Sequence, residues 1–191
     1  MVMWKKILDP HITNLPLISS SFLPILFHPP DAPLTIHIAV YLPTSGKETE
    51  FVNELAKLSI AVDDLGKAYP KAAKFIRGDF NVNNKNPKRS QALDLFCFQH
   101  KLQEVHIPKP TYHHFTGEGK SDSFLDRVFF SSSDTSFESL TEIECSKENP
   151  IIDSHHDLIR TELVLPTIHD SSDKPKDKLG LSWAKLSSSW D

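Results

Sequence analysis

A nine-residue stretch of alternating apolar side chains, Leu34–Leu42, constrains the fold more than any other part of the sequence. This period of two predicts a strand with one face in a core. Apolar residues then recur at helical spacing over Lys47–Leu65, after a Ser45 and a Glu48 that fit a capping box. A second apolar run, Ala73–Arg77, predicts another strand. A strand, a helix and a strand in this order predict an α/β fold.

The second half of the chain combines one further helix, Ser90–Lys101, with short strand-like runs. Its apolar residues Leu93, Phe96 and Cys97 are expected to face inward. The mixture of elements predicts a mixed sheet in a domain over residues 1–166, followed by a polar tail over residues 167–191. The expected strands are Gln103–Ile107, Thr111–Phe115, Phe124–Phe130, Phe137–Ile143 and Asp157–Leu165, with polar loops at Thr116–Ser123 and Ser131–Ser136.

Composition limits the functional class and the compartment. The chain has 191 residues and a net charge of −4, which excludes a strongly basic nucleic-acid coat protein but not a nuclease with a local basic groove. Two cysteines are too few for a secreted disulfide scaffold, so no disulfide partner is expected. The apolar stretch Leu15–Phe27 is interrupted by Pro16 and Pro24, and is shorter than the roughly 20 residues that span a bilayer. We therefore expect a core strand there and an intracellular protein without a membrane segment or a secretion signal.

Polar side chains follow the second predicted strand at Gly78-Asp79-Phe80-Asn81. In an extended segment Asp79 and Asn81 lie on the same side, while Phe80 points into the core. Asp79 offers a carboxylate for proton transfer or for a metal, and Asn81 offers an amide for a phosphate or a water molecule. The alternative is a simple Asx turn at the end of a strand.

A second group of polar candidates surrounds Asp126, which lies in an apolar run and needs a partner if it is buried. A histidine is the obvious partner. Neighbouring residues of a strand face opposite sides, so His155 and His156 cannot both bind one metal, and the same holds for His113 and His114. One histidine of the first pair is expected to face a site and the other solvent. Each of the ten histidines, taken alone, is more often a surface or structural residue than a catalytic one.

Together these segments resemble the endonuclease/exonuclease/phosphatase superfamily, and most closely the endonuclease domain of non-LTR retrotransposons. The resemblance implies two packed mixed β-sheets flanked by helices, Mg²⁺-dependent hydrolysis of phosphodiesters, and DNA as the partner, with the nucleus as a possible compartment. It rests on five segments in order: Tyr41-Leu42-Pro43, Gly78-Asp79-Phe80-Asn81, Pro110-Thr111-Tyr112, Leu125-Asp126 and Ser154-His155-His156.

The resemblance also implies roles for five residues. His156 would act as a general base or phosphate contact, and Asp126 would orient it. Asp79 would handle the attacking water or the leaving oxygen, while Asn81 and Tyr41 would hold the phosphate. Three basic residues after the GDFN segment are either DNA backbone contacts or part of a solvated loop, namely Lys85, Lys88 and Arg89.

Two departures from the family pattern lead to a further expectation. The strands that carry the family's Asn and its metal-binding Glu have no counterpart before Tyr41, and His155 stands where the family usually has an aspartate. We therefore expect a domain that lacks its first strands, in which Mg²⁺ binding and nuclease activity are impaired. Two alternatives remain: a phosphatase of the same fold acting on a small phosphorylated molecule, and a non-catalytic remnant that binds a partner.

Overall fold

A six-stranded mixed sheet forms the centre of the computed structural model, which describes residues 6–29, 32–83, 85–116, 119–131, 142–146 and 155–162. The strand order is β1-β2-β3-β4-β8-β5, with β3 and β4 parallel and the other neighbours antiparallel. A short 3-10 helix, η1 (Lys6–His11), precedes it. The strands are β1 (Ile12–Asn14), β2 (Phe22–Phe27), β3 (Thr35–Tyr41), β4 (Ala73–Asp79), β5 (Gln103–Glu104) and β8 (Asp126–Ser131).

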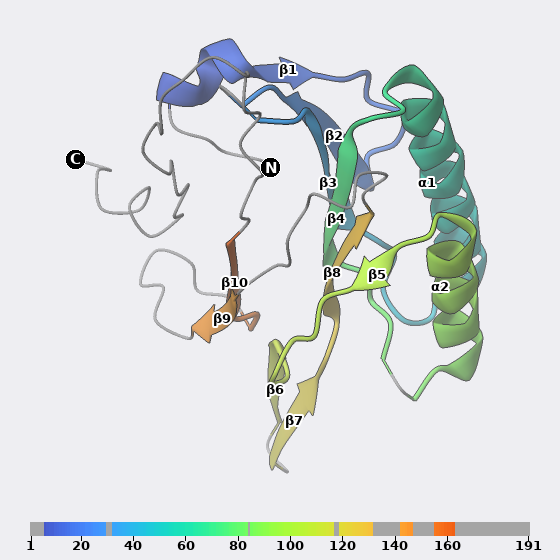
Figure 1. Cartoon of the computed structure of the whole chain (residues 1–191). Coiled ribbons are helices and arrows are strands. Elements are labelled where there is room, and N and C mark those ends of the chain that lie inside the picture. Colours follow the sequence, from blue (N-terminus) through green and yellow to red (C-terminus); the bar gives the residue numbers. More distant parts are fainter. Residues whose placement is uncertain are drawn as a thin grey trace.

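Two helices, α1 (Glu48–Ala68) and α2 (Pro87–Gln99), cover one face of this sheet (Figure 1). The apolar stripe predicted for the first helix is buried at Phe51, Leu55, Leu58 and Val62. The helix spans Glu48–Ala68 rather than Lys47–Leu65. Beneath the helices, the alternate residues of β3 are buried as its period of two predicts.

The predicted capping box at Ser45 and Glu48 is wrong. The N-cap of α1 is Lys47, and no side chain caps the helix start. Glu48 instead pairs with Arg89 at the start of α2, 41 positions away in the sequence. A contact of such long range overrides a local capping pattern, and four-residue motifs do not contain the information that would reveal it.

The expected core strand within Leu15–Phe27 is present as β2, which pairs with β3. The second half follows the predicted strands less closely. The expected strand Gln103–Ile107 contracts to the two residues of β5, and the expected second helix begins three residues earlier, at Pro87. Residues 132–141 and 163–191 lie outside the described part of the chain, and with them the predicted loop after Ser131 and the predicted tail.

A hairpin of β6 (Tyr112–Thr116) and β7 (Gly119–Ser123) extends beyond one end of the central sheet (Figure 1). The polar loop expected at Thr116–Ser123 is therefore wrong, because most of it is β7. That strand is exposed over four of its five residues, so it shows no alternation of apolar and polar side chains.

A third, two-stranded sheet pairs β9 (Glu142–Ser146) with β10 (Leu158–Glu162). It lies on the opposite side of the central sheet from the helices (Figure 1). A mixed central sheet, a small antiparallel sheet and helices together fit the predicted α/β class. Neither described helix is long and apolar enough to cross a membrane.

Candidate functional site

Three neighbouring strands place polar side chains in one row at the end of the sheet. Tyr41 at the end of β3 is the direct partner of Asp79 at the end of β4, and Asp79 is the direct partner of Asp126 at the start of β8. Directly paired residues point to the same face of a sheet. Three residues separated by up to 85 positions are thereby brought to one edge, as their position at strand ends predicts. The Tyr41 side chain is exposed, whereas Asp79 is buried.

The turn after β4 is built by Gly78 and Asn81. Gly78 has a φ of +141°, and a Cβ at this position would lie 2.0 Å from the carbonyl oxygen of Val40 on β3. Only glycine therefore allows this approach of the two strands. Asn81 adopts a left-handed φ of 51°, its backbone N–H donates to Asp79 Oδ1 at 2.8 Å, and its amide donates to the Leu42 carbonyl at 2.8 Å. The Asx turn expected as the alternative is therefore present, and this same turn places Asp79 and Asn81 next to each other.

A chain of polar contacts links four side chains at this edge. The Thr111 hydroxyl donates to Asp126 Oδ2 at 2.6 Å, and His156 Nδ1 lies 2.9 Å from the same oxygen. On the other side of the ring, His156 Nε2 lies 3.8 Å from Asp79 Oδ2. A carboxylate can only accept, so the hydrogen of the neutral imidazole is on Nδ1 and its lone pair is on Nε2, facing Asp79. The structure thus brings together Asp79, Asp126 and His156.

The electrostatic environment makes Asp79 unusual. The pKa of its carboxyl is raised from the ordinary 3.8 to about 6, mainly by burial. The hydrogen bond from the Asn81 backbone lowers this pKa, and the nearby Asp126 charge raises it. A carboxyl with a pKa near 6 changes its protonation state close to neutral pH. Such a group can take a proton from a reacting water, which an exposed aspartate does poorly.

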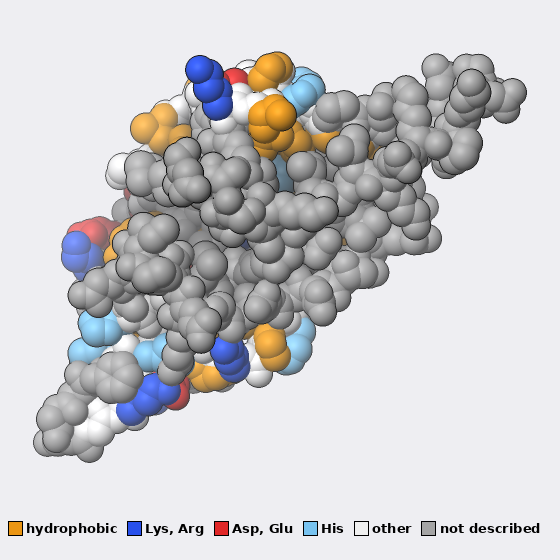
Figure 2. Space-filling model, turned by 90° about the vertical axis from the view of Figure 1, so that its left-hand side faces the viewer, with side chains coloured by type: hydrophobic (Ala, Val, Ile, Leu, Met, Phe, Trp, Pro, Cys, Tyr) orange, Lys and Arg blue, Asp and Glu red, His pale blue; other side chains and the backbone are white. Residues whose placement is uncertain are grey.

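The Tyr112 ring packs against His156. Tyr112 forms an isolated β-bridge with His156, and their ring centroids are 4.9 Å apart. The Tyr112 ring also contacts His114 and His155, which are both exposed. His156 thus lies in the site and His155 is exposed, as expected for two neighbouring residues. Histidine, lysine and arginine side chains gather toward the lower end of the face in Figure 2, where Figure 1 places the β6–β7 hairpin.

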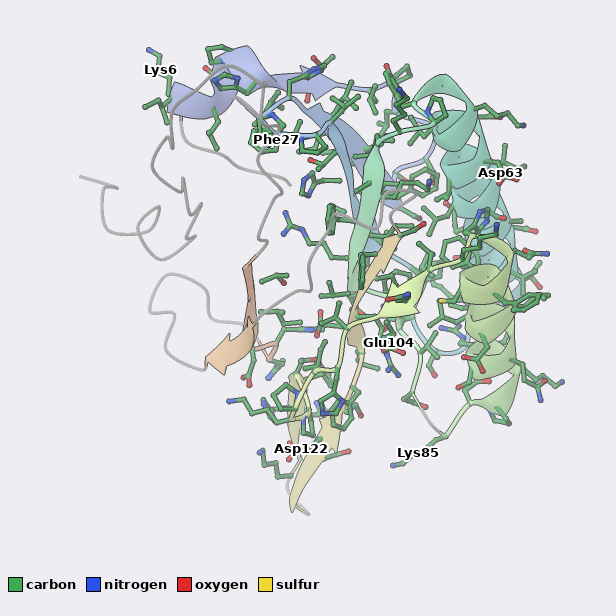
Figure 3. The ribbon with its side chains drawn as sticks, viewed as in Figure 1. Lys6, Phe27, Asp63, Lys85, Glu104 and Asp122 are labelled. Carbon is green, nitrogen blue, oxygen red and sulfur yellow. The ribbon has the colours of Figure 1, made fainter. Side chains whose placement is uncertain are left out.

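The three basic residues after the GDFN segment have different positions. Lys85 and Lys88 are exposed, and Figure 3 places Lys85 at the same end of the molecule as Asp122 of β7. Neither alternative expected for Arg89, a DNA backbone contact or part of a solvated loop, is correct, since its side chain is only 2% exposed. Its guanidinium donates to the backbone carbonyls of Pro43, Thr44 and Asn81 and to the Glu48 carboxylate. Arg89 thus joins the loops that follow β3 and β4.

The similarity of this chain to known proteins is found among solved structures. No protein-family model matches the chain, and no curated protein matches it significantly. Among solved structures, the endonuclease domain of TRAS1, a telomere-specific non-LTR retrotransposon, is similar with a TM-score of 0.63 at 13% identity. An endonuclease/exonuclease/phosphatase from Beutenbergia cavernae is similar with a TM-score of 0.52 at 18% identity. The chain has the endonuclease/exonuclease/phosphatase fold.

The extent of these matches differs between the solved structures. The match to the TRAS1 domain covers 81% of this chain and 68% of that domain. D. rerio TDP2 complexed with a single-strand DNA product has a TM-score of 0.53 at 12% identity, over 78% of this chain and 67% of TDP2. The match to the Beutenbergia cavernae protein covers 71% of this chain and 37% of that protein. At these identities the likeness concerns the endonuclease/exonuclease/phosphatase fold alone.

The donor atoms present can be compared with the needs of the Mg²⁺ that the resemblance implies. Magnesium requires oxygen ligands in near-octahedral geometry, part of them from carboxylates. The Asp79 carboxylate and the Asn81 amide lie together, but the described residues contain no group of three or more His, Cys, Asp or Glu side chains that could hold a metal ion. Within the described residues, these donors do not make a complete magnesium site.

In the sequence, Thr111 stands out only as part of the Pro110-Thr111-Tyr112 segment that resembles the family, with no role of its own. Its hydroxyl is one of two hydrogen-bond donors to Asp126 Oδ2, and it is fully buried. Thr111 lies 15 positions before Asp126, and no local pattern of residues connects the two.

We expect Thr111→Val, which keeps the shape but removes the hydroxyl, to lower the free energy of unfolding by about 1–3 kcal/mol, because a buried carboxylate oxygen loses a donor. Thr111→Ser keeps the donor and serves as the matched control. Urea unfolding of both variants measures the difference. A loss of stability in Ser but not in Val would indicate that methyl packing, not the hydroxyl, is what Thr111 contributes.

Proposed function

We propose that the chain is a slow phosphodiester hydrolase that acts on DNA, with its reaction centre at Asp79 and His156. The proposal is supported by one observation above all: the chain of contacts from Thr111 through Asp126 and His156 to Asp79. Such a constellation orients an imidazole, fixes its tautomer and places a carboxyl with a pKa of about 6 beside it. The DNA-processing activities of similar structures, a retrotransposon endonuclease and TDP2, point to the same substrate class.

The separation between the two central groups assigns their roles. An in-line displacement at phosphorus has its attacking and leaving oxygens on opposite sides. His156 Nε2 and Asp79 Oδ2 are only 3.8 Å apart, so they act at the same end of the reaction. We assign the ionised Asp79 as the base that takes a proton from the attacking water. The lone pair of His156 Nε2 accepts a hydrogen bond from the same water and orients it. The bond from phosphorus to the leaving oxygen breaks on the far side, where the leaving oxygen takes a proton from solvent water.

The remaining predicted residues surround this pair. Asn81 is held by its bond to the Leu42 carbonyl, and the exposed Tyr41 lies in the next strand beside Asp79. Both are proposed to hold the phosphate, as the resemblance implies. Lys85 and Lys88 are proposed to contact the DNA backbone from the loop and the helix start at this end of the sheet. Slow turnover is proposed because Mg²⁺ would find few oxygen ligands among the described residues and because His155 occupies the family's aspartate position.

Nicking of supercoiled plasmid, with Mg²⁺ and with EDTA, tests the proposal. We expect slow nicking by the unmodified chain and a loss of roughly 100-fold or more in His156→Ala. His106→Ala is the matched control, because His106 is an exposed histidine outside the site and its removal should leave the rate unchanged.

Three results would contradict parts of the proposal. Equal rates in His156→Ala and His106→Ala would remove His156 from the reaction. Hydrolysis of small phosphorylated molecules by the same variants, without nicking, would favour the phosphatase alternative. No hydrolysis of either substrate class would leave a non-catalytic binding protein as the conclusion.

A further inference from the structure

A second histidine–carboxylate cluster lies outside the proposed reaction centre, at the base of the β6–β7 hairpin. The ring of His113 on β6 lies between two aspartates: Nδ1 is 2.6 Å from Asp122 Oδ1 on β7, and Nε2 is 3.2 Å from Asp157 Oδ1. Lys120 lies 3.0 Å from Asp122, and Lys109 lies 3.8 Å from Asp157. Basic and acidic side chains therefore alternate through these five residues.

The inner half of this cluster is buried. The Asp157 side chain is 3% exposed and the His113 side chain 10%, whereas Asp122 is 37% exposed. Among the described residues, neither His113 Nε2 nor Asp157 Oδ2 has a hydrogen-bond partner. Asp157 thus depends on His113 and Lys109 for compensation of its charge. A buried carboxylate without such compensation is strongly disfavoured, so the His113 ring holds Asp157 in place.

Asp157 directly follows His156 in the chain. Two backbone hydrogen bonds flank His156 and join its segment to β6: the His113 N–H donates to the His155 carbonyl at 2.8 Å, and the Asp157 N–H donates to the Thr111 carbonyl at 2.6 Å. The His113–Asp157 ion pair adds a side-chain link across the same two segments. The position of the His156 ring against Asp126 therefore depends on how firmly these segments are joined.

We propose that His113 is a positioning residue for His156: held between Asp122 and Asp157, it clamps the residues around His156 to β6 and thereby keeps the His156 ring on Asp126 and Asp79. Its consequence for hydrolysis rests on the proposed function, but the clamp itself does not. Both ring nitrogens of His113 face a carboxylate: Nδ1 forms a hydrogen bond with Asp122, and Nε2 is in close contact with Asp157. The clamp therefore requires a polar group toward each aspartate from one side chain.

Two neutral substitutions each keep one half of this clamp. His113→Gln places an amide donor near the position of Nε2, toward Asp157, and His113→Asn places one near Nδ1, toward Asp122. The two variants have the same charge and nearly the same polarity. If His113 only stabilises the hairpin, both substitutions should have the same effect on the His156 ring. If His113 positions His156, Gln should preserve the position of that ring and Asn should not.

The measurement is the ¹H–¹⁵N spectrum of the histidine rings in the full chain, with the His156 signal assigned by its absence in His156→Gln. We expect the His156 Nδ1 proton, bonded to Asp126, to remain in His113→Gln and to be lost or shifted toward that of an exposed histidine in His113→Asn. The same His156 signal in both variants, or its loss in Gln alone, would overturn the proposal. Nicking is expected to follow the signal, with a loss of roughly 10–100-fold in Asn.

Two further outcomes remain interpretable. If the His156 signal behaves as expected and no variant nicks DNA, the clamp is supported and the proposed hydrolysis fails. If neither His113 variant folds, Asp122→Ala removes the exposed partner instead. Amide exchange at Asp157 is then expected to accelerate several-fold, because the His113 ring loses one of its two anchors. Unchanged exchange at Asp157 in a folded Asp122→Ala chain would contradict the proposal.

Discussion

Arg89→Met is expected to lower the free energy of unfolding by at least about 3 kcal/mol. The guanidinium is 2% exposed and donates to three backbone carbonyls, those of Pro43, Thr44 and Asn81. A methionine fills the volume over the Phe51 ring, where the guanidinium carbon lies 4.3 Å from the ring centroid, but leaves these acceptors without their donor. Each lost buried hydrogen bond of this kind costs about 1–3 kcal/mol. Urea unfolding measures the change.

Two control variants separate charge from geometry. Arg89→Lys keeps the charge but replaces a planar group with five donors by a single ammonium. We therefore expect its free energy of unfolding to lie between that of the unmodified chain and that of the methionine variant. Lys88→Met, at an exposed neighbouring position, should change stability little. If Arg89→Met is as stable as Lys88→Met, Arg89 does not hold the loops after β3 and β4 together. Small domains have only about 5–15 kcal/mol of stability, so a loss of the expected size is readily detected.

The sequence predicts elements of this fold best where a repeating pattern reflects a buried face. The alternation in β3 and the helical spacing in α1 belong to segments with one face on the core, and both were found where predicted. The hairpin strand β7 has little buried surface, so its polar sequence predicted a loop. Helix α2 was found from the inward positions of Leu93 and Phe96, but its start was misplaced because Pro87 at the first turn was not used as a signal.

Sequence patterns likewise predict the position of some residues of the candidate site and not of others. The position of Asp79, Asn81, Asp126 and His156 at one edge could be predicted because each follows or precedes an apolar run, and strand ends gather at one edge of a sheet. Arg89 was misjudged as an exposed DNA contact because a basic residue after a loop has the same local pattern whether it faces solvent or a set of carbonyls. Its partners are 8 to 46 positions away, and only the folded chain brings them together.

Asp79→Asn is expected to make the chain more stable and inactive at the same time. Burial raises the pKa of Asp79 from 3.8 to about 6, so the folded chain holds this proton more tightly than the unfolded chain does. Between these two pKa values the folded state binds more protons, and stability therefore falls as pH rises from about 4 to about 6 and stays low above that. Asparagine cannot ionise, keeps an oxygen for the Asn81 N–H and avoids this cost.

The expected gain is about 1–3 kcal/mol above pH 6 and close to zero below about pH 4, since two pKa units correspond to roughly 3 kcal/mol before allowance for solvent. Urea unfolding of both proteins at about pH 4 and about pH 8 measures it, with Asp64→Asn on the exposed side of α1 as the control. Plasmid nicking by the unmodified chain should rise through about pH 6 as Asp79 ionises, and Asp79→Asn should lose roughly 100-fold or more.

Equal stability of the two proteins at about pH 8 would contradict the buried, costly carboxylate. Fast Mg²⁺-dependent nicking that Asp79→Asn abolishes would instead contradict the proposed slow turnover and indicate that a further residue completes the metal ligands. In the proposed reaction, hydrolysis requires the ionised carboxyl of Asp79, whereas this charge opposes folding. Asn at this position is therefore expected to favour stability, and Asp the proposed reaction.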